Sequence, residues 1–284
     1  MKQIMDTDFL GANCAKKEYL LCECVNRSIV NDEITALEFA WPGPEPVSGQ
    51  FFMVRLQRTA VFLGRPLSVA GFQPTSPGKP GTLRFLMAVR GQGTKELAEI
   101  GIGERAFLTG PLGRGWELAA GTSPNDNSLP GGKLFKRSFA LISGGIGIAP
   151  LAFFAREIQD RQDAQSCYDF YAGFKGRSFG LEGLNPGSLV ISSEDGSEGK
   201  KGRIPDFFTP DFYDAVFACG PEPMLKTVAE KCKAASVSCY ISMERRMACG
   251  TGACLGCAIK TVNGNKRCCA DGPVFNAEEI IFDE

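Results

Sequence analysis

No histidine occurs among the 284 residues of this sequence. The absence excludes Ser-His-Asp and Cys-His catalysis, because both mechanisms need an imidazole base. It also excludes zinc or iron sites with a histidine ligand, Rieske centres and a histidine-ligated haem. Redox or transfer chemistry must therefore depend on other side chains or on a bound cofactor.

The sequence also lacks a strong charge imbalance and long apolar runs. Its net charge is −1, so nothing predicts electrostatic capture of nucleic acid or of an anionic membrane. No run reaches the roughly 18 apolar residues of a spanning helix. The N-terminal stretch MKQIMDTDFLGANCAKKEYL has neither the apolar core nor the cleavage site of a signal peptide. We expect a cytoplasmic protein that binds neither nucleic acid nor membrane.

Cysteine, in contrast, is abundant, with 12 residues in the chain. The cytoplasm keeps thiols reduced, so these residues are expected to be free thiols or metal ligands. Six of them lie scattered among apolar or strand-like residues, where we expect buried structural thiols. These are Cys14, Cys22, Cys24, Cys167, Cys232 and Cys239.

A second group of cysteines is concentrated near the end of the chain. Cys249, Cys254 and Cys257 follow the spacing C-x4-C-x2-C, and Cys268 and Cys269 lie a short distance further on. This is the plant-type pattern of a 2Fe–2S cluster, with three thiolates from one loop and a fourth from a returning segment. Intervening glycines allow the loop to curl tightly around the sulfurs. A structural zinc site is the alternative, but it would more often show two C-x2-C knuckles. Spacing alone permits either Cys268 or Cys269 as the fourth ligand.

The middle of the chain predicts a nucleotide-binding sheet. Residues 139–142 form an apolar strand, Ser-Gly-Gly-Ile-Gly makes a turn, and a helix follows with proline near its first turn. Such a turn presents backbone N–H groups and a helix start to a pyrophosphate, so Gly144, Gly145 and Gly147 are candidate binding residues. Further strands at 167–174, 189–195 and 214–220 predict a parallel α/β sheet that binds ligands at the carboxyl ends of its strands.

The N-terminal third has a different pattern. Short, partly alternating runs separated by Pro and Gly turns predict an antiparallel β-barrel. The fold class is therefore multi-domain, with an antiparallel β-barrel, an α/β parallel-sheet domain and a small C-terminal cluster domain. The expected boundaries are an N-terminal extension at 1–16, the barrel at 17–120, a Gly/Pro/Ser/Asn-rich linker at 121–137, the sheet at 138–238 and the cluster domain at 239–284.

In this order, barrel, sheet and cysteine segment resemble the ferredoxin–NADP reductase superfamily and, within it, the electron-transfer subunits of dihydroorotate dehydrogenase B. The resemblance covers the chain from about Tyr19 onward. It implies that the barrel binds FAD through the Arg-Pro-Leu-Ser-Val segment at 65–69. Arg65 would neutralise the FAD phosphate, and Ser68 would hydrogen-bond near flavin N5. The FAD-binding residues would be Arg65, Pro66, Leu67 and Ser68, together with Gly91, Gly93 and Thr94 of the Gly-Gln-Gly-Thr segment.

The same resemblance predicts the nicotinamide site. The segment ACGPEPML at 218–225 is similar to the one that closes the nicotinamide pocket in the superfamily. It would place Cys219 beside the nicotinamide carbon that exchanges hydride with the flavin, with Gly220 next to it. Cys219 is not assigned as a nucleophile, because hydride transfer needs alignment and exclusion of water. Asp195, or Glu194 before it, would bond the NAD ribose, and that loop has no arginine for a 2′-phosphate, which favours NAD over NADP.

The cysteine segment favours one member of the superfamily. The run from Glu244 to Phe275 is similar to the dihydroorotate dehydrogenase pattern, which makes Cys269 the fourth ligand. The NADH-dependent ferredoxin:NADP reductase subunit has aspartate where this chain has Cys249. The resemblance implies a subunit that passes electrons between NAD and an FMN-bearing dihydroorotate dehydrogenase catalytic subunit, through FAD and the 2Fe–2S cluster, in pyrimidine biosynthesis.

The implied assembly is a heterotetramer of two such chains with two catalytic chains. Two alternatives belong to other classes of protein. One is an NAD(P)H:acceptor reductase that stands alone or serves an oxygenase, a hydrogenase or a ferredoxin:NADP system. The other is a non-enzymatic adaptor whose cysteine segment is held together by a structural zinc ion.

Overall fold

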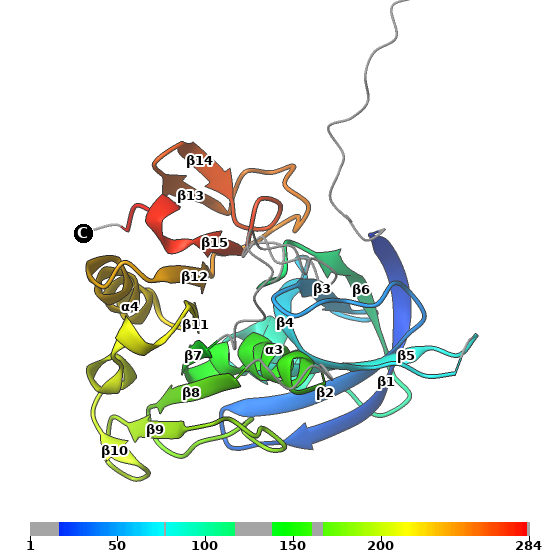
Figure 1. Cartoon of the computed structure of the whole chain (residues 1–284). Helices are drawn as coiled ribbons and strands as arrows, with labels where there is room; N and C mark the ends of the chain where they lie inside the picture. The colour runs from blue at the N-terminus through cyan, green and yellow to red at the C-terminus, as the bar shows by residue number, and fades with distance from the viewer. Residues whose placement is uncertain (1–16, 77, 117–137, 161–166, 283–284) are drawn as a thin grey trace, which may run out of the picture.

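The computed structural model describes residues 17–76, 78–116, 138–160 and 167–282. Figure 1 shows a barrel, coloured blue to cyan, beside a sheet coloured green to yellow, with the orange and red C-terminal segment lying against both. The expected N-terminal extension at 1–16 and the linker at 121–137 lie outside the described residues. Within the described part of the chain, no helix has the length and apolar character needed to cross a bilayer.

The first unit is a closed six-stranded antiparallel barrel, as the alternating pattern predicts. Along β1 the side chains alternate in burial, and Cys22 and Cys24 point into the interior, which is filled by aromatic side chains such as Phe52 and Phe85. The strand order around the barrel is β1-β2-β5-β4-β3-β6. The strands are β1 (Glu18–Ile29), β2 (Ile34–Trp41), β3 (Phe51–Leu56), β4 (Arg65–Gln73), β5 (Gly81–Ala88) and β6 (Arg105–Leu112), and α1 (Gln92–Ala98) follows β5.

Strand β4 changes its partner halfway along its length. Residues from Arg65 to Ser68 pair with β3, whereas residues from Val69 onward pair with β5. The register with β5 shifts between Val69 and Gly71, so Ala70 is the extra residue of a β-bulge. Bulges redirect neighbouring side chains and often lie next to functional sites. The segment Arg65–Ser68 therefore lies at a corner of the barrel.

The second unit is a seven-stranded sheet with the order β10-β9-β8-β7-β11-β12-β15. All its pairs are parallel except that of β15, which runs antiparallel to β12. The central strand β7 is buried on both faces, which explains its continuous apolar run. The strands are β7 (Ser138–Gly144), β8 (Cys167–Phe174), β9 (Leu189–Ser193), β10 (Lys200–Lys201), β11 (Ala215–Cys219), β12 (Ser238–Ser242) and β15 (Val274–Asn276).

Two α-helices and short 3-10 turns accompany this sheet. Helix α3 (Ile148–Asp160) packs against β7, β8 and β11 and also against β4 of the barrel, and α4 (Glu222–Ala234) packs against β11 and β12. The 3-10 turn η1 (Gly145–Gly147) leads into α3, and η2 (Ile204–Phe207) and η3 (Pro210–Phe212) precede β11. The multi-domain α/β and β-barrel class expected from the sequence is confirmed.

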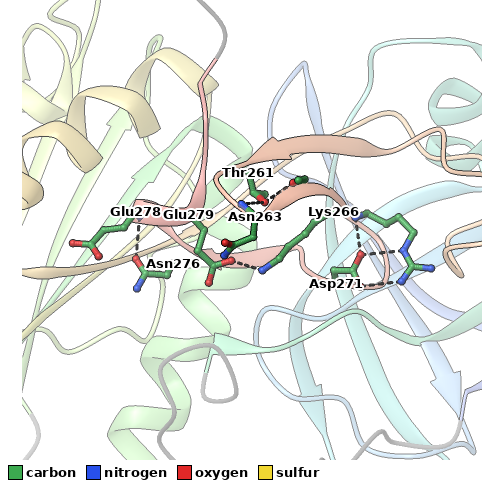
Figure 2. Close-up of polar contacts among 9 residues, drawn as sticks. Thr261, Asn263, Lys266, Asp271, Asn276, Glu278 and Glu279 are labelled. Carbon is green, nitrogen blue, oxygen red and sulfur yellow. Dashed lines mark hydrogen bonds and ion pairs between the residues drawn. The ribbon is translucent and has the colours of Figure 1, made fainter.

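The C-terminal segment adds a small hairpin, β13 (Ala258–Thr261) and β14 (Gly264–Arg267), and the 3-10 turn η4 (Ala277–Glu279). Figure 2 shows how polar side chains join this hairpin to the end of the chain: Lys266 pairs with Glu279, and Asn276 accepts a bond from the Glu278 N–H. The sequence places the cluster domain at 239–284, but β12 and β15 complete the parallel-sheet unit. Strand pairing with β11 thus carries the sheet past that boundary.

Candidate functional site

The two segments predicted to bind FAD lie together at the barrel corner. A Cβ atom added at Gly93 would stand 2.3 Å from Nε of Arg65, so the Arg65 guanidinium lies directly on the glycine of α1. That Nε is buried and has no hydrogen-bond partner. A buried guanidinium N–H without an acceptor is costly, and a phosphate oxygen would satisfy it. The residues present therefore fit the pyrophosphate of a dinucleotide.

The other residues of these two segments shape the corner. Thr94 Oγ1 accepts bonds from the N–H groups of Arg90 (2.9 Å) and Gly91 (3.0 Å), so its hydroxyl fixes the entry into α1. Pro66 pairs with Met53 of β3, and Leu67 is buried. Ser68 is half-buried and pairs with Phe51, at the point where β4 changes partner.

The predicted nucleotide turn lies at the carboxyl ends of β7 and β11. A Cβ at Gly147 would stand 2.2 Å from the carbonyl oxygen of Cys219, and one at Gly220 would stand 2.9 Å from the backbone nitrogen of Gly144. Only glycine permits this close approach of two chain segments. Gly145 has a φ of +54°, and no atom lies within 4 Å of the position that its Cβ would take. The turn is thus open on the side where a ligand would lie.

Two buried hydroxyls near this turn lack partners. Ser143 Oγ, at the end of β7, and Ser192 Oγ, at the end of β9, are both buried without a hydrogen bond. Unsatisfied polar groups at the carboxyl edge of a parallel sheet are consistent with a nucleotide site there.

Cys219 ends β11 and is buried. Burial, and then the charge of Glu244, raise the pKa of its thiol, although Ser242 bonds to the sulfur and lowers it. A protonated thiol is not an activated nucleophile. The environment therefore does not favour Cys219 as a nucleophile.

Asp195 lies on an exposed loop beyond β9. Its Oδ1 accepts from Ser197 Oγ (2.6 Å) and from the Ser197 N–H (2.9 Å), and these bonds lower its pKa. Its own N–H donates to the carbonyl of Lys175, at the end of β8, over 3.4 Å. Glu194 is also exposed. Both carboxylates therefore lie at the same edge of the sheet as the glycine turn.

The four predicted cluster ligands come together as two pairs. In one pair the Cys254 N–H donates to the Cys249 sulfur (3.5 Å) and the two side chains also interact. In the other, the Cys269 N–H donates to the Cys257 sulfur (3.4 Å), and the two thiols share a side-chain hydrogen bond. In the described ranges, no three Cys, Asp or Glu side chains are placed to hold one metal ion. Two pairs suit a cluster of two irons better than a tetrahedral zinc site.

The hairpin explains why these pairs form. Cys257 precedes β13 and Cys268 follows β14, and the Cys268 N–H donates to the Cys257 carbonyl over 3.0 Å. Cys268 points the other way: its thiol is fully buried and bonds to the Met243 carbonyl at 2.9 Å. Burial raises the pKa of Cys268 to about 12, and the pKa of Cys269 is raised to about 12 as well, so the bond to Met243, and not the pKa, distinguishes the two thiols.

Cys249 has the opposite electrostatic environment. Partial burial alone would raise its pKa, but N–H groups of Cys254 and Thr251 donate to its sulfur and lower the pKa to about 6. Backbone N–H groups that point at a sulfur stabilise the thiolate, which is the form that binds iron.

The cysteine loop packs directly on the barrel. Gly250, with a φ of +69°, is buried, and a Cβ added there would stand 2.5 Å from Cγ of Met53. Met53 pairs with Pro66 in the predicted flavin segment. Met53 of β3 therefore contacts the loop of Cys249 through its side chain and the Arg65–Ser68 segment through strand pairing.

Sequence reasoning did not identify several residues that the fold brings to this site. Met53 belongs to no motif, and Glu244, although it begins the cysteine motif, gave no sign that its charge would act on Cys219. The Glu244 residue is exposed as a whole, but desolvation of its carboxyl raises the pKa, and the charge of Arg90 lowers it. An acidic residue between a strand and a cysteine loop carries no signal, because its neighbours come from distant parts of the chain.

Comparison with known proteins agrees with these observations. Residues 244–281 match the model of the "Iron-sulfur cluster binding domain of dihydroorotate dehydrogenase B". A protein of Caldanaerobacter subterraneus subsp. tengcongensis, named "Dihydroorotate dehydrogenase B (NAD(+)), electron transfer subunit", is 38% identical over 90% of this chain and 96% of its own length. A protein of Clostridium perfringens with the same name is 39% identical over 83% of this chain and 87% of its own length.

Solved structures show the same architecture. A structure of an "NADH-dependent reduced ferredoxin-NADP oxidoreductase" superposes with a TM-score of 0.73 and 25% identity, covering 93% of this chain and 91% of the other. A ferredoxin reductase of carbazole 1,9a-dioxygenase superposes with a TM-score of 0.61 and 18% identity, covering 79% of this chain and 68% of the other, a likeness that concerns the fold.

Proposed function

Because this chain belongs to the family of dihydroorotate dehydrogenase B electron-transfer subunits, we propose that it passes electrons between an FMN-bearing catalytic subunit and NAD. FAD supplies the chemistry that exchanges a two-electron hydride with nicotinamide and single electrons with an iron–sulfur cluster. The oxidation of dihydroorotate belongs to the partner, and the pathway is pyrimidine biosynthesis.

Arg65 is the main flavin anchor in this proposal. Its orphaned Nε donates to the FAD pyrophosphate, and Gly93 leaves the space that the guanidinium needs. Thr94 and Gly91 hold the turn that carries Gly93, and Pro66 and Leu67 fix the strand. Ser68 bonds to the flavin ring from the barrel corner.

The chain's role toward NAD is to orient the nicotinamide and to exclude water. Gly144, Gly145 and Gly147 offer an open turn to the pyrophosphate. Cys219 and Gly220 form the wall beside the nicotinamide, and the buried Cys219 thiol keeps that wall dry. The Asp195 carboxylate accepts hydrogen bonds from the ribose hydroxyls.

For the cluster we propose the ligands Cys249, Cys254, Cys257 and Cys269, with Cys268 as a structural thiol. The arrangement of the four thiols as two pairs supports this ligand set. The backbone N–H groups around Cys249 stabilise its thiolate.

One observation carries the proposal. The loop that holds Cys249 packs on Met53, and Met53 pairs with the flavin segment. The proposed cluster loop and the proposed flavin segment are therefore joined through Met53, which supports electron passage between them.

The proposal is tested by reconstitution with the catalytic subunit, in a heterotetramer. We expect the isolated chain, loaded with FAD and cluster, to reduce artificial dyes with NADH and to leave dihydroorotate unoxidised. Addition of the catalytic subunit should give dihydroorotate-dependent reduction of NAD⁺. Oxidation of dihydroorotate by this chain alone, or a catalytic subunit that neither binds it nor gains NAD⁺ reduction from it, would contradict the assignment.

We also place the protein in the cytoplasm. Support comes from its thiols: the described cysteines, both the structural group and the cluster group, are free. Free thiols persist where the surroundings keep them reduced.

A further inference from the structure

Helix α3 follows the predicted nucleotide turn and contacts the barrel through two adjacent side chains, Arg156 and Glu157. Its first turn follows the glycines of η1. Near its other end, Arg156 Nη1 donates to the carbonyl of Ala70 in β4 over 3.1 Å, and Nη2 donates to the carbonyl of Glu182 over 3.1 Å. Arg156 therefore spans from the sheet unit to the barrel.

The carbonyl of Ala70 is available because Ala70 is the bulged residue of β4. Val69 and Gly71 each have a partner on β5, whereas Ala70 has none, and it is buried. A buried backbone carbonyl outside the ladder needs another donor, and Arg156 supplies it. Ala70 lies two residues beyond Ser68, so this bond fixes the strand close to the predicted flavin contact.

Glu157 makes a second contact between α3 and the barrel, at Ser48. Its Oε1 accepts from the N–H of Ser48 (3.0 Å) and its Oε2 accepts from Ser48 Oγ (2.6 Å). Ser48 is fully buried, and two residues later the carbonyl of Gln50 accepts the Val69 N–H over 3.0 Å. The two anchors of α3 thus act on Val69 and Ala70, the two residues that follow Ser68.

From this arrangement we propose that Arg156 and Glu157 are positioning residues, which hold the Ser68 strand in fixed alignment with the nucleotide turn for hydride transfer. The inference rests on the proposed function. In the step concerned, a hydride leaves C4 of NADH, which is oxidised to NAD⁺, and bonds to N5 of FAD, which is reduced. Such a step depends steeply on the distance and angle between the two rings.

The test uses the full chain loaded with FAD and cluster, under anaerobic conditions. Arg156→Met keeps the aliphatic stem and removes both donors. We expect the rate constant of flavin reduction at saturating NADH to fall about tenfold, with a larger isotope effect for NADH deuterated at C4. The NADH dissociation constant, the FAD content and the iron content should stay within about twofold of the wild type.

Substitutions at Glu157 sharpen the test. Glu157→Ala should also slow flavin reduction, and Glu157→Gln should recover most of the rate, because an amide can bond to both Ser48 groups. Glu230→Gln, which neutralises an exposed carboxylate of α4, is the matched control. If Arg156→Met does not fold, Arg156→Lys, which can reach only one of the two carbonyls, takes its place.

The outcomes separate cleanly. A flavin-reduction rate that stays at the wild-type value, or that falls only in proportion to FAD content, would overturn the positioning role. A wild-type chain that holds no flavin, or whose flavin NADH does not reduce, would instead contradict the proposed function.

Discussion

At the scale of single residues, the most informative atom is Nε of Arg65, which is buried without a partner beside Gly93. Hydrogen bonds to charged groups contribute about 1.5–3 kcal/mol. We therefore predict that Arg65→Ala raises the dissociation constant of FAD by about one to two orders of magnitude. Flavin fluorescence during titration of the flavin-free variant measures this constant.

Arg58→Ala is the control for Arg65, because it removes an exposed positive charge from the loop before β4. It should bind FAD as the wild type does. Full occupancy of Arg65→Ala after extensive dialysis would show that Arg65 does not bind the phosphate.

The adjacent cysteines Cys268 and Cys269 give a second residue-scale prediction. The Cys269 sulfur lies with that of Cys257, whereas the Cys268 thiol bonds to the Met243 carbonyl. Cys269→Ser should therefore abolish or severely weaken cluster incorporation, and Cys268→Ser should keep iron and acid-labile sulfide near the wild-type content. Assays of iron and acid-labile sulfide after anaerobic purification test this prediction. The reverse pattern would mean that Cys268, and not Cys269, is the fourth ligand.

At the scale of elements, the contact between α3 and the barrel predicts a pH dependence. The pKa of Glu157 is raised from an ordinary value of 4.5 to about 6, mainly by burial and in part by the carboxylates Glu45 and Asp160, against the lowering effect of the bonds from Ser48. The folded protein thus binds this proton more tightly than the unfolded chain does. The stabilisation that the bound proton gives to the folded state is full below about pH 4.5 and is lost as the pH rises through about 6.

Glu157→Gln removes this proton linkage and keeps acceptor and donor atoms for Ser48. Relative to pH 4.5, the wild type should lose about 1 kcal/mol more unfolding free energy than the variant by pH 7, after allowance for partial exposure. Urea denaturation of both proteins across this range gives the difference. A difference that does not change with pH would mean that Glu157 has an ordinary pKa.

Most elements could be predicted from sequence, and the exceptions have a common physical cause. The continuous apolar run of β7, the alternation in β1 and the glycine turn before α3 are local patterns, and each gave the right element. The antiparallel strand β15 gave no signal, because its three residues become a strand only by pairing with β12. The bulge at Ala70 and its bond to Arg156 likewise depend on segments 86 residues apart.

At the scale of the whole molecule, what matters is how the three parts touch, and local sequence says little about that. The cysteine spacing predicts a cluster segment, but not that Gly250 packs on Met53 or that the Arg114 N–H bonds to the Gly272 carbonyl over 2.6 Å. Both contacts join the barrel to the cluster segment. They bring the cysteine segment against the barrel through residues that carry no signal of this contact in the sequence.

The contact at Gly250 gives the last prediction. Gly250→Ala would place a Cβ 2.5 Å from Cγ of Met53 in a backbone with a φ of +69°. Overpacking in a well-packed region typically costs about 1–3 kcal/mol, so the loop should move away from β3. We expect slower reduction of the cluster by the flavin, per cluster present, while reduction of the flavin by NADH keeps its wild-type rate. Anaerobic rapid-mixing spectroscopy follows both steps.

Gly264→Ala, in the hairpin turn, is the matched control. Gly264 has a φ of +92°, but no atom lies within 4 Å of its added Cβ. It therefore carries the same kind of backbone strain as Gly250→Ala, about 1 kcal/mol or more, without the clash. If both variants slowed the flavin-to-cluster step equally, strain within the cluster segment would be the cause. A loss confined to Gly250→Ala would instead mean that the contact with Met53 sets the rate at which electrons pass between the two parts.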